Sequence, residues 1–231
     1  MKFGVLFSGG KDSTLALHLT VEEGHQVVCL ITVVSKNKES YMFHTANVDV
    51  TVLQAQALRL PLVSVNTEGC KEEELVDLEK AILQAKTQFG IEGIVTGAVE
   101  SVYQTSRVQR ICDKLCLKCF NPLWRYDPRE LLEKLLERNF QVIISGVFAY
   151  PLNVSWLGKQ LNHDLIIQLL ELSEKFGLSI TGEGGEIETT ILDAPMFKQK
   201  VEVITSEIIW NHTSGVYVIK KAKLVPKRCF C

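Results

Sequence analysis

The chain has 231 residues, of which 46% are hydrophobic and 23% are charged, as is ordinary for a soluble globular protein. No apolar stretch reaches the roughly 20 residues that a bilayer requires, and no signal-peptide cleavage pattern follows Met1, so we expect a cytoplasmic protein without a membrane partner. Its formal net charge of −2 excludes a global attraction to nucleic acid, and no direct nucleic-acid partner is expected.

The first predicted element is a short strand that ends in a glycine-rich turn. Apolar residues 3–7 lead into Ser8-Gly-Gly-Lys-Asp-Ser13, after which a helical pattern begins. Glycines let the backbone turn sharply and approach an anion, and the free N–H groups at the helix start point at that anion. Hydroxyl and ammonium groups of the turn add further donors. The spacing does not fit the usual phosphate loop G-x-x-x-x-G-K-[ST].

This turn resembles the loop of the pyrophosphate-loop ATPases, also called N-type ATP pyrophosphatases. The resemblance implies cleavage of ATP between its α and β phosphates, which leaves AMP and pyrophosphate, with the loop holding the pyrophosphate portion. The turn follows the carboxyl end of a predicted first strand, where ligands bind in open α/β sheets. From the six residues alone, a glycine-rich turn that binds nothing is the alternative.

Strand and helix patterns alternate through the first half of the chain. Uninterrupted apolar runs predict buried strands at 27–34, 62–65 and 94–96, and apolar residues from Leu75 to Phe89 recur at helical spacing. This alternation is typical of an α/β fold. We predict a Rossmann-like parallel sheet with helices on both faces, similar to the adenine nucleotide alpha hydrolases.

Three cysteines follow these elements. Cys112, Cys116 and Cys119 have the C-x3-C-x2-C spacing of the cluster ligands in radical S-adenosylmethionine enzymes. In that class the triad belongs to a repeated strand–helix barrel, whereas here it follows a nucleotide-binding half and alternates with apolar residues. We favour thiols packed as small hydrophobic groups, and the sequence leaves their role open.

Two prolines, Pro122 and Pro128, interrupt the rhythm and mark a boundary or a rigid crossover. We predict a pyrophosphate-loop ATP-binding domain at residues 1–125 and a smaller α+β substrate-binding domain at 126–231. The second domain is predicted to contain a helix at 131–136, a strand at 142–147, a helix at 161–176 and an antiparallel pair at 201–204 and 216–219.

An acidic motif lies in this second half. Residues 181–190 place Glu183, Glu186 and Glu188 around a Gly-Gly pair. Crowded like charges cost free energy unless a cation is bound there or the side chains splay into water, and the glycines allow a tight fold that gathers them. The segment alone leaves a functional site and a solvated acidic turn equally open.

Several motifs together resemble the diphthine–ammonia ligases, also called diphthamide synthetases, across nearly the whole chain. Besides the phosphate loop they are Met42–Thr45, Gly97–Ser101 with Tyr103, Gln104, Arg107 and Val108, Pro122–Trp124, Leu157–Lys159, and Gly182–Thr189 with Leu192, Asp193 and Pro195. Ile187 stands where the family commonly has an aromatic residue. Cys116 and Cys119 lie outside the family pattern.

The resemblance implies amidation of a carboxylate. Diphthine, a modified histidine of translation elongation factor 2, becomes diphthamide, while ATP and ammonium are consumed and AMP and pyrophosphate are released. Transfer of AMP to the carboxylate gives an acyl-adenylate with a good leaving group. Ammonia then attacks it, and a positioned base removes the extra proton.

Site residues follow from the matching motifs. The phosphates are expected to contact Ser8, Gly9, Gly10, Lys11, Asp12 and Ser13. Asp12 can also orient Mg²⁺ or cap the helix. Thr32 is expected to present backbone groups to adenine and Gly97 to admit the nucleotide, while His44 either approaches the phosphates or is merely packed or solvent-facing. The acyl site is expected to be lined by Glu100, Ser101, Tyr103 and Gln104.

Diphthine carries a trimethylammonium group, which has no N–H to donate and is best met by aromatic faces and carboxylates. Tyr103, Trp124 and Tyr126 are the aromatic candidates. The three acids of the 181–190 motif either receive this cation or gather ammonium and accept its protons. The sequence does not choose between these roles.

Two rival functions remain open from the sequence. One is another AMP-forming pyrophosphate-loop enzyme that acts on tRNA, which would need a local basic surface. The other is an ATP-sensing module without turnover, although such modules carry their phosphate glycines late in the fold. The oligomeric state is open, and a homodimer is one arrangement that we consider.

Overall fold

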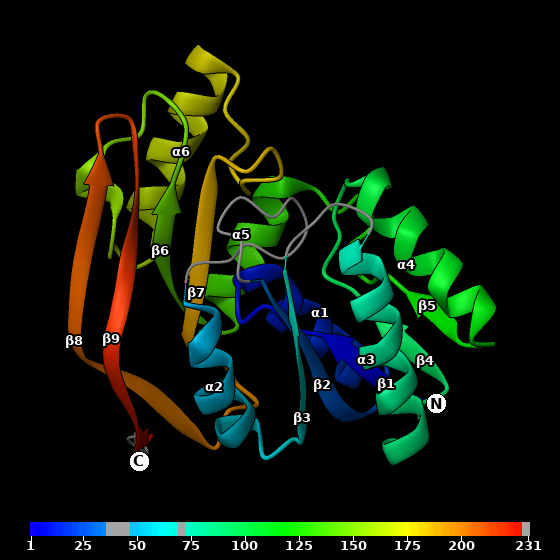
Figure 1. Ribbon diagram of the computed structural model, residues 1–231. Helices are drawn as coiled ribbons and strands as arrows, with labels where there is room; N and C mark the ends of the chain where they lie inside the picture. Colours follow the sequence, from blue (N-terminus) through cyan, green and yellow to red (C-terminus); the bar gives the residue numbers. More distant parts are fainter. Residues whose placement is uncertain (36–46, 69–72, 228–231) are drawn as a thin grey trace.

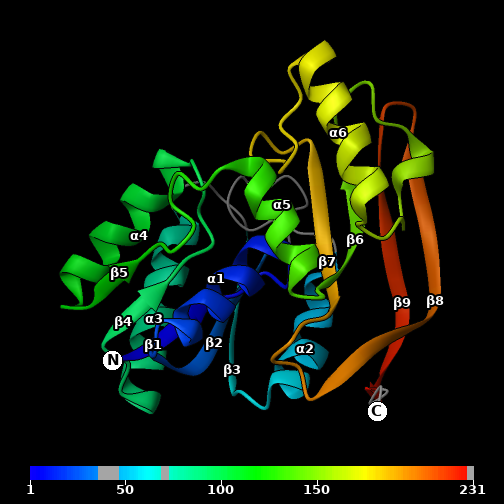
Figure 2. The same ribbon diagram turned by 180° about the vertical axis from the view of Figure 1, so that it is seen from behind.

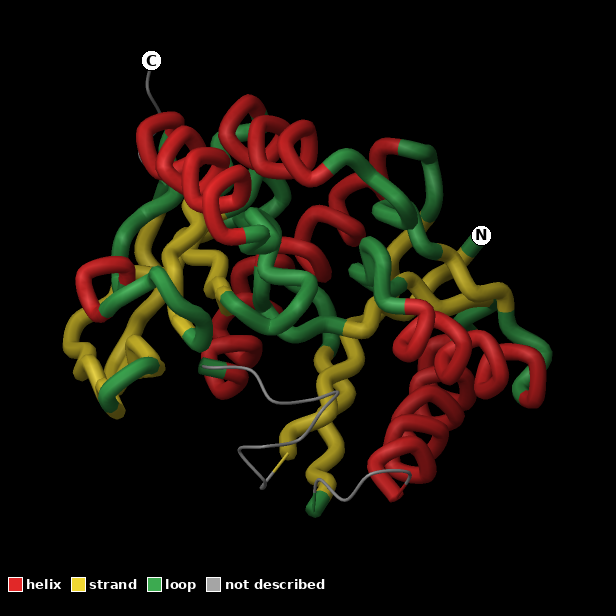
Figure 3. The backbone as a smooth tube through the Cα atoms, turned by 90° about the horizontal axis from the view of Figure 1, so that it is seen from above, coloured by secondary structure: helices red, strands yellow, loops and turns green. Residues whose placement is uncertain are grey.

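The protein is built from two sheets with helices around and between them (Figure 1). The computed structural model describes residues 1–35, 47–68 and 73–227. Seen from above, the strands of the two sheets form separate groups (Figure 3). Among the described residues, no helix is both long enough and apolar enough to cross a membrane.

The first sheet has five parallel strands in the order β3-β2-β1-β4-β5. Their bounds are Lys2–Leu6 for β1, Gln26–Ser35 for β2, Leu62–Thr67 for β3, Gly93–Val95 for β4 and Lys118–Phe120 for β5. The order reverses between β1 and β4, and such a reversal opens a crevice beyond the carboxyl ends of the two strands. The predicted parallel sheet is confirmed, and the glycine-rich turn lies at this crevice.

Helices cover both faces of the parallel sheet (Figures 1 and 2). On one face, apolar side chains of β1 share a core with α1 (Lys11–Glu22) and α2 (Thr51–Leu58). On the other face, β2 and β4 share a second core with α3 (Glu73–Phe89) and α4 (Val102–Lys114). The central strands β1, β2 and β4 are mostly buried because helices cover both faces of the sheet, whereas the outer strands β3 and β5 carry exposed polar residues such as Ser64 and Lys118.

The second sheet is antiparallel, in the order β7-β6-β9-β8. Its strands are Gln141–Val147 for β6, Ile187–Asp193 for β7, Gln199–Asn211 for β8 and Ser214–Pro226 for β9. The predicted antiparallel pair is confirmed as the β8–β9 hairpin, which is paired over its whole length. The sequence did not predict β7, which contains the second half of the acidic motif.

Two helices accompany this sheet, α5 (Pro128–Glu137) and α6 (His163–Phe176). Asp127 caps α5 by accepting a hydrogen bond from the Glu130 N–H, and Pro128 occupies the first turn, where its missing N–H costs nothing. The proline-rich segment therefore ends in a helix start. The domain boundary at residues 125 and 126 stays a prediction.

The two halves of the chain share one hydrophobic core. Leu15 of α1, Leu135 of α5 and Ile191 of β7 belong to the same buried cluster. Helix α1 contacts β7, and α2 contacts β8 and β9 (Figure 1). This packing brings β7, with its acidic residues, to the carboxyl end of β1.

Candidate active site

The phosphate loop links β1 to α1 in a closed turn. Gly9 has φ +78°, a left-handed conformation that favours glycine, and a Cβ there would collide with the side-chain oxygen of Gln54. The Ser8 N–H donates to Ser13 Oγ over 3.3 Å, and the two serine hydroxyl oxygens lie 3.2 Å apart. The hydroxyls of Ser8 and Ser13 thus lie together at the start of α1.

A cavity of about 650 Å³ opens at this loop. Its lining combines three separate stretches of the chain: Ser8 and Gly10–Ser13 of the loop, Thr96–Ala98, Ser101 and Gln104 after β4, and Thr181–Gly185 with Ile187–Thr189 of the acidic motif. Thr32 also lines it, and its hydroxyl donates to the Phe7 carbonyl over 2.6 Å. The predicted nucleotide loop and the predicted acidic site therefore face one common space.

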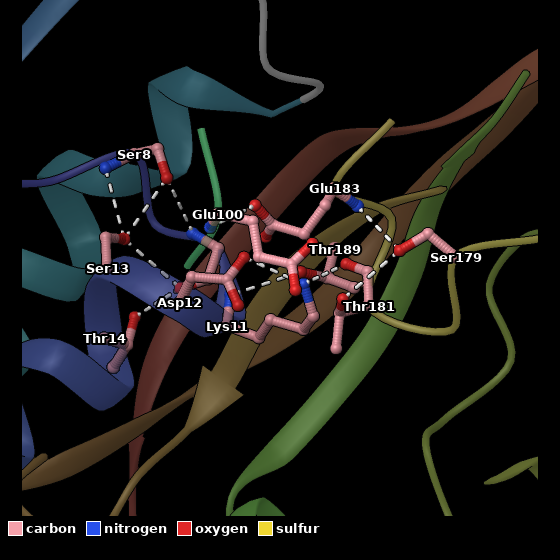
Figure 4. A network of polar contacts seen from close by, with 11 residues as sticks. Ser8, Lys11, Asp12, Ser13, Thr14, Glu100, Ser179, Thr181, Glu183 and Thr189 are labelled. Atoms are coloured by element: carbon pink, nitrogen blue, oxygen red, sulfur yellow. Dashed lines mark hydrogen bonds and ion pairs between the residues drawn. The ribbon is translucent and has the colours of Figure 1, made fainter. Parts of the chain in front are cut away.

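Lys11 joins the loop directly to the acidic motif (Figure 4). Its backbone N–H donates to Thr189 Oγ1 over 3.1 Å, and its ammonium donates to the Thr181 carbonyl over 2.5 Å and to Asp12 Oδ2 over 2.8 Å. The side chain of Lys11 is only 5% exposed. The ammonium predicted to contact phosphate is thus held between the loop and the 181–190 segment.

A second connection lies beneath the loop. The Nε2 amide of Gln54, on α2, donates to the Gly9 carbonyl over 2.9 Å and to the Ile191 carbonyl over 2.8 Å. The Ile191 N–H also donates to the Gly9 carbonyl over 3.0 Å. Gln54 is fully buried, so both bonds are shielded from water. The sequence does not indicate a role for Gln54, because a single glutamine in a helical pattern does not show which carbonyl groups it contacts.

Asp12 offers a carboxylate oxygen to the cavity. Its Oδ2 accepts from Lys11, whereas its Oδ1 is buried and has no hydrogen-bond partner within the described residues. A buried oxygen of this kind suits a hard cation such as Mg²⁺. No group of three or more His, Cys, Asp or Glu side chains could hold a metal ion in the described ranges. Asp12 Oδ1 would hold a magnesium ion bound there.

Glu183 is a half-buried carboxyl at the same cavity (Figure 4). One carboxylate oxygen accepts from the Glu100 N–H over 3.4 Å, and the Glu183 N–H donates to Ser179 Oγ over 3.1 Å. Burial, and then the negative charge of Asp12, raise the pKa of Glu183, while the Lys11 ammonium opposes the rise. A carboxyl with a raised pKa in a cavity is suited to general acid–base chemistry.

The other two acids of the motif lie in different settings. Glu186 turns into its own loop, where Oε1 accepts from the Ser179 N–H over 3.2 Å and Oε2 is buried without a hydrogen-bond partner in the described part of the chain. Glu188, on β7, is half-buried and lines the cavity. Gly182, at φ +74°, permits this fold because a Cβ would collide with the Ile187 carbonyl. The three glutamates of the predicted acidic cluster therefore lie in three different environments.

The loop after β4 approaches the phosphate loop very closely. A Cβ on Gly97 would lie 2.6 Å from the Ser13 nitrogen and 2.7 Å from the Asp12 carbonyl carbon. We predicted that a glycine at position 97 leaves room for the nucleotide. The structure gives a further reason for a glycine there, namely its close contact with the start of α1. Ser101 caps α4 by accepting from the Gln104 N–H over 3.3 Å, and both residues line the cavity as predicted acyl-site residues.

The predicted aromatic residues lie away from the cavity lining. The Arg107 guanidinium stands 3.3 Å from the ring centroid of Tyr103. Tyr126 packs against the shared core, with the Lys134 ammonium 5.3 Å from its ring centroid. Trp124 is half-buried in the segment after β5, and none of Tyr103, Trp124 and Tyr126 contributes to the cavity wall.

Two further predictions concern His44 and the three cysteines. His44 lies outside the described residues. Of the three cysteines, Cys112 is buried, Cys119 is half-buried and Cys116 is exposed. A hydrogen bond to Cys119, together with burial, raises the pKa of the Cys112 thiol. Cys112 thus lies on α4 and packs in the core that this helix shares with the parallel sheet.

Comparisons with known proteins cover almost the whole chain. The family model described as diphthamide synthase N-terminal domain matches residues 1–119, and the diphthamide synthase C-terminal domain matches residues 127–225. The two matches together span the phosphate loop, the loop after β4 and the acidic motif.

Individual relatives agree with the family models. A diphthine–ammonia ligase of Rattus norvegicus is 34% identical, over 98% of this chain and 96% of its own. One of Homo sapiens is 35% identical, over 90% of this chain and 85% of its own. Among solved structures, a predicted subunit of a tRNA methyltransferase from Methanocaldococcus jannaschii aligns with 84% of this chain and 98% of its own, at a TM-score of 0.43 and 16% identity.

Proposed function

The chain belongs to the diphthamide synthase family, and we propose that it is a diphthine–ammonia ligase, an AMP-forming carbon–nitrogen ligase. It uses ATP and ammonium to convert diphthine to diphthamide. One observation carries the proposal: the phosphate loop and the acidic motif line a single cavity and are joined by Lys11. A nucleotide on the loop would therefore have its α phosphate close to a substrate held against the acidic motif.

The chemistry proceeds in two balanced steps. A carboxylate oxygen of diphthine attacks the α phosphorus of ATP, the bond from that phosphorus to the bridging oxygen breaks, and pyrophosphate leaves with the electron pair. Ammonia then attacks the acyl carbon of the acyl-adenylate, the carbon–oxygen bond to AMP breaks, and AMP leaves. The four hydrogens of ammonium divide between the amide, which keeps two, and solvent, which receives two protons.

Backbone and hydroxyl donors of the loop hold the pyrophosphate portion of ATP. The N–H groups that open α1 have no partners within the helix and carry its positive dipole end, so they favour an anion. Gly9 and Gly10 allow the close approach, and the hydroxyls of Ser8 and Ser13 add donors. Thr32 of β2 lines the same cavity, and we place the adenine of ATP beside it.

Asp12 is the residue that we assign to Mg²⁺. Its buried Oδ1 supports this role, because within the described residues it has no hydrogen-bond partner. Bound Mg²⁺ supplies charge neutralisation to the phosphates. The neighbouring Lys11 ammonium partly balances the carboxylate and holds it in place through Oδ2.

Glu183 is the base that we assign to the amination step. Its raised pKa makes it a better proton acceptor than an ordinary carboxylate, and its carboxylate is held beside Glu100 at the cavity. It takes one proton from ammonium, which frees the lone pair that attacks. Glu186 stabilises the turn of the acidic motif by accepting a hydrogen bond from the Ser179 N–H. Ser101 and Gln104 border the acyl group.

The protein substrate that we propose is translation elongation factor 2 in its diphthine form. Elongation takes place in the cytoplasm, which is where we place this enzyme. The net charge of −2 supports a protein rather than a nucleic-acid substrate. A homodimer remains the oligomeric state to test.

Product analysis tests the proposal. The protein is incubated with ATP, ammonium and elongation factor 2 carrying diphthine, and AMP and ADP are resolved by chromatography. We expect AMP and pyrophosphate to form in equal amounts, only with the diphthine substrate, and Asp12→Asn to abolish both. Release of ADP, or AMP release that depends on tRNA instead, would refute the assignment.

A further inference from the structure

We infer that Phe148 and Glu188 together form the site that receives the quaternary ammonium group of the substrate side chain. The inference rests on the proposed function for the identity of the cation. In this site Phe148, which no sequence motif marks, supplies the aromatic contact. Glu188 binds the cation and so has a different role from Glu183.

The pairing of β6 with β7 brings these two residues to one face of the sheet. Gly146 of β6 lies directly opposite Glu188 of β7. Alternate residues of a strand share a face, and Phe148 stands two residues beyond Gly146, immediately after β6 ends at Val147. All three positions therefore belong to the same side of the β6–β7 pair.

Gly146 provides the space in which the Phe148 ring lies. A Cβ on Gly146 would come within 2.6 Å of Phe148 Cε2, 2.9 Å of Phe148 Cζ and 3.0 Å of Glu188 Cβ. The ring thus folds back over Gly146 and lies beside the side chain of Glu188. Any larger residue at position 146 would push the ring away from the acid.

The backbone of Phe148 is bonded to the acidic motif, and the residue is partly exposed. The Phe148 N–H donates to the Glu186 carbonyl over 2.9 Å, which attaches the residue to the acidic motif. Phe148 is 36% exposed, although its ring is apolar. Glu188, beside it, lines the cavity. A partly exposed aromatic residue therefore lies beside a carboxylate of the cavity wall, and Phe148 itself stands just outside the cavity lining.

This combination matches one chemical class of ligand. A quaternary ammonium group has a diffuse positive charge and no N–H, so a hydrogen-bonding site does not favour it, whereas an aromatic face attracts it. The carboxylate adds Coulombic attraction without needing a donor. Phe7 is the aromatic residue that lines the cavity within the described part of the chain. It is only 2% exposed, so its ring offers little surface to a ligand. Phe148 is the exposed alternative.

Binding of a small probe tests this site without turnover. The probe is 2-(trimethylammonio)butyrate, which reproduces the charged end of the diphthine side chain, and its methyl resonance is followed by NMR during titration with the protein. We expect Phe148→Leu to weaken binding about tenfold, because the ring face is lost while apolar bulk stays. Phe148→Trp should bind at least as tightly as the unchanged protein. Gly146→Ala should also weaken binding.

Two controls make the result specific. Tyr150→Leu removes a neighbouring aromatic side chain that is 80% exposed and packs on Phe176 at 5.5 Å between ring centroids; it should leave probe binding unchanged. The comparison ligand is 2-(dimethylamino)butyrate, whose protonated nitrogen carries an N–H. Its affinity should change less than that of the trimethylammonium probe in Phe148→Leu.

The outcomes separate this inference from the proposed function. Equal probe binding by Phe148→Leu and the unchanged protein, or equal loss in Phe148→Leu and Tyr150→Leu, would overturn the inference. Probe binding that depends on Phe148 in a protein that does not amidate diphthine would uphold the cation site and refute the function. If the Phe148→Leu protein still amidates diphthine and binds the probe with unchanged affinity, the proposed function is upheld and the cation site is refuted.

Discussion

The backbone N–H of Lys11 donates to the hydroxyl of Thr189 over 3.1 Å, although the two residues are 178 positions apart in the sequence. The first residue of α1 is therefore held by a strand of the second sheet. The phosphate loop is therefore hydrogen-bonded to β7, and we expect nucleotide binding to be coupled to the acidic motif. This coupling is the basis of the first prediction.

Replacement of Thr189 should weaken ATP binding. Thr189→Val leaves the buried Lys11 N–H without its acceptor, and such an unsatisfied group costs about 1–3 kcal/mol. The KM for ATP should rise, while Thr189→Ser, which keeps the hydroxyl, should stay close to the unchanged protein. Steady-state kinetics with varied ATP check this. Equal KM values for the two variants would show that the hydroxyl does not hold the loop.

The pH dependence of amidation should follow Glu183. Its pKa is raised above the usual 4.5, so the basic form appears only as the pH rises through that higher value, and the rate should increase over the same range. Glu183→Gln should lower kcat by about 10²- to 10⁴-fold and remove this acidic limb. A pH–rate profile of both proteins is the measurement.

The electrostatic cause of that raised pKa can be measured separately. Asp12→Asn removes a negative charge that raises the pKa of Glu183, so the pKa should fall. Lys11→Met removes an opposing positive charge, and the pKa should rise further. NMR titration of the Glu183 carboxyl carbon follows both variants without requiring activity. Shifts in the same direction in both variants would contradict this explanation.

Glu186 should tolerate a change that Glu183 does not. Glu186 uses Oε1 to accept a hydrogen bond from the Ser179 N–H, and a glutamine side chain retains such an oxygen. Glu186→Gln should therefore keep most of the amidation rate, whereas Glu186→Ala should lose it through distortion of the turn. If Glu186→Gln is as inactive as Glu183→Gln, Glu186 takes part in the chemistry itself.

Gly97 should not accept a side chain. A Cβ would lie 2.6 Å from the Ser13 nitrogen, and overpacking of this kind typically costs about 1–3 kcal/mol. Gly97→Ala should lower both the free energy of unfolding in urea and the affinity for ATP. Gly90→Ala is the control: its Cβ meets nothing within 4 Å, so any cost comes from φ +62° alone and ATP affinity should be kept.

His18 should make the fold sensitive to acid. Burial, and to a smaller extent the positive charges of Arg138 and Lys134, lower its pKa below 6.5 even though Glu22 opposes them. A lowered pKa means that its contribution to stability is present above pH 6.5 and is lost as the pH falls through the lower folded-state value. His18→Gln should flatten this dependence in urea unfolding measured at several pH values. An unchanged slope would exclude His18 as its cause.

The sequence predicted those features that depend on neighbouring residues. The loop Ser8–Ser13 is a contiguous motif, and the parallel strands are apolar runs whose burial on both faces is visible in the sequence. The fold class was accordingly within reach, whereas the meeting of the loop and the acidic motif in one cavity was not predicted. The family resemblance supplied the substrate.

Features that depend on distant contacts were not predictable. Gln54 and Thr189 acquire their roles from partners on other elements, and no local pattern announces a buried amide that bonds two carbonyls. The three glutamates looked alike because spacing does not reveal that β7 begins at Ile187 and separates Glu188 from Glu186. Tyr103 was predicted from its motif, but Arg107 covers its ring.

An isotope-transfer experiment can show whether ATP activates the carboxylate of diphthine before amination. Diphthine on elongation factor 2 is labelled with heavy oxygen in its carboxylate and incubated with the enzyme, ATP and ammonium, and the AMP is analysed by mass spectrometry. Attack of the carboxylate on the α phosphorus predicts one heavy oxygen in every AMP formed with diphthamide. Diphthamide formation with unlabelled AMP would contradict the account.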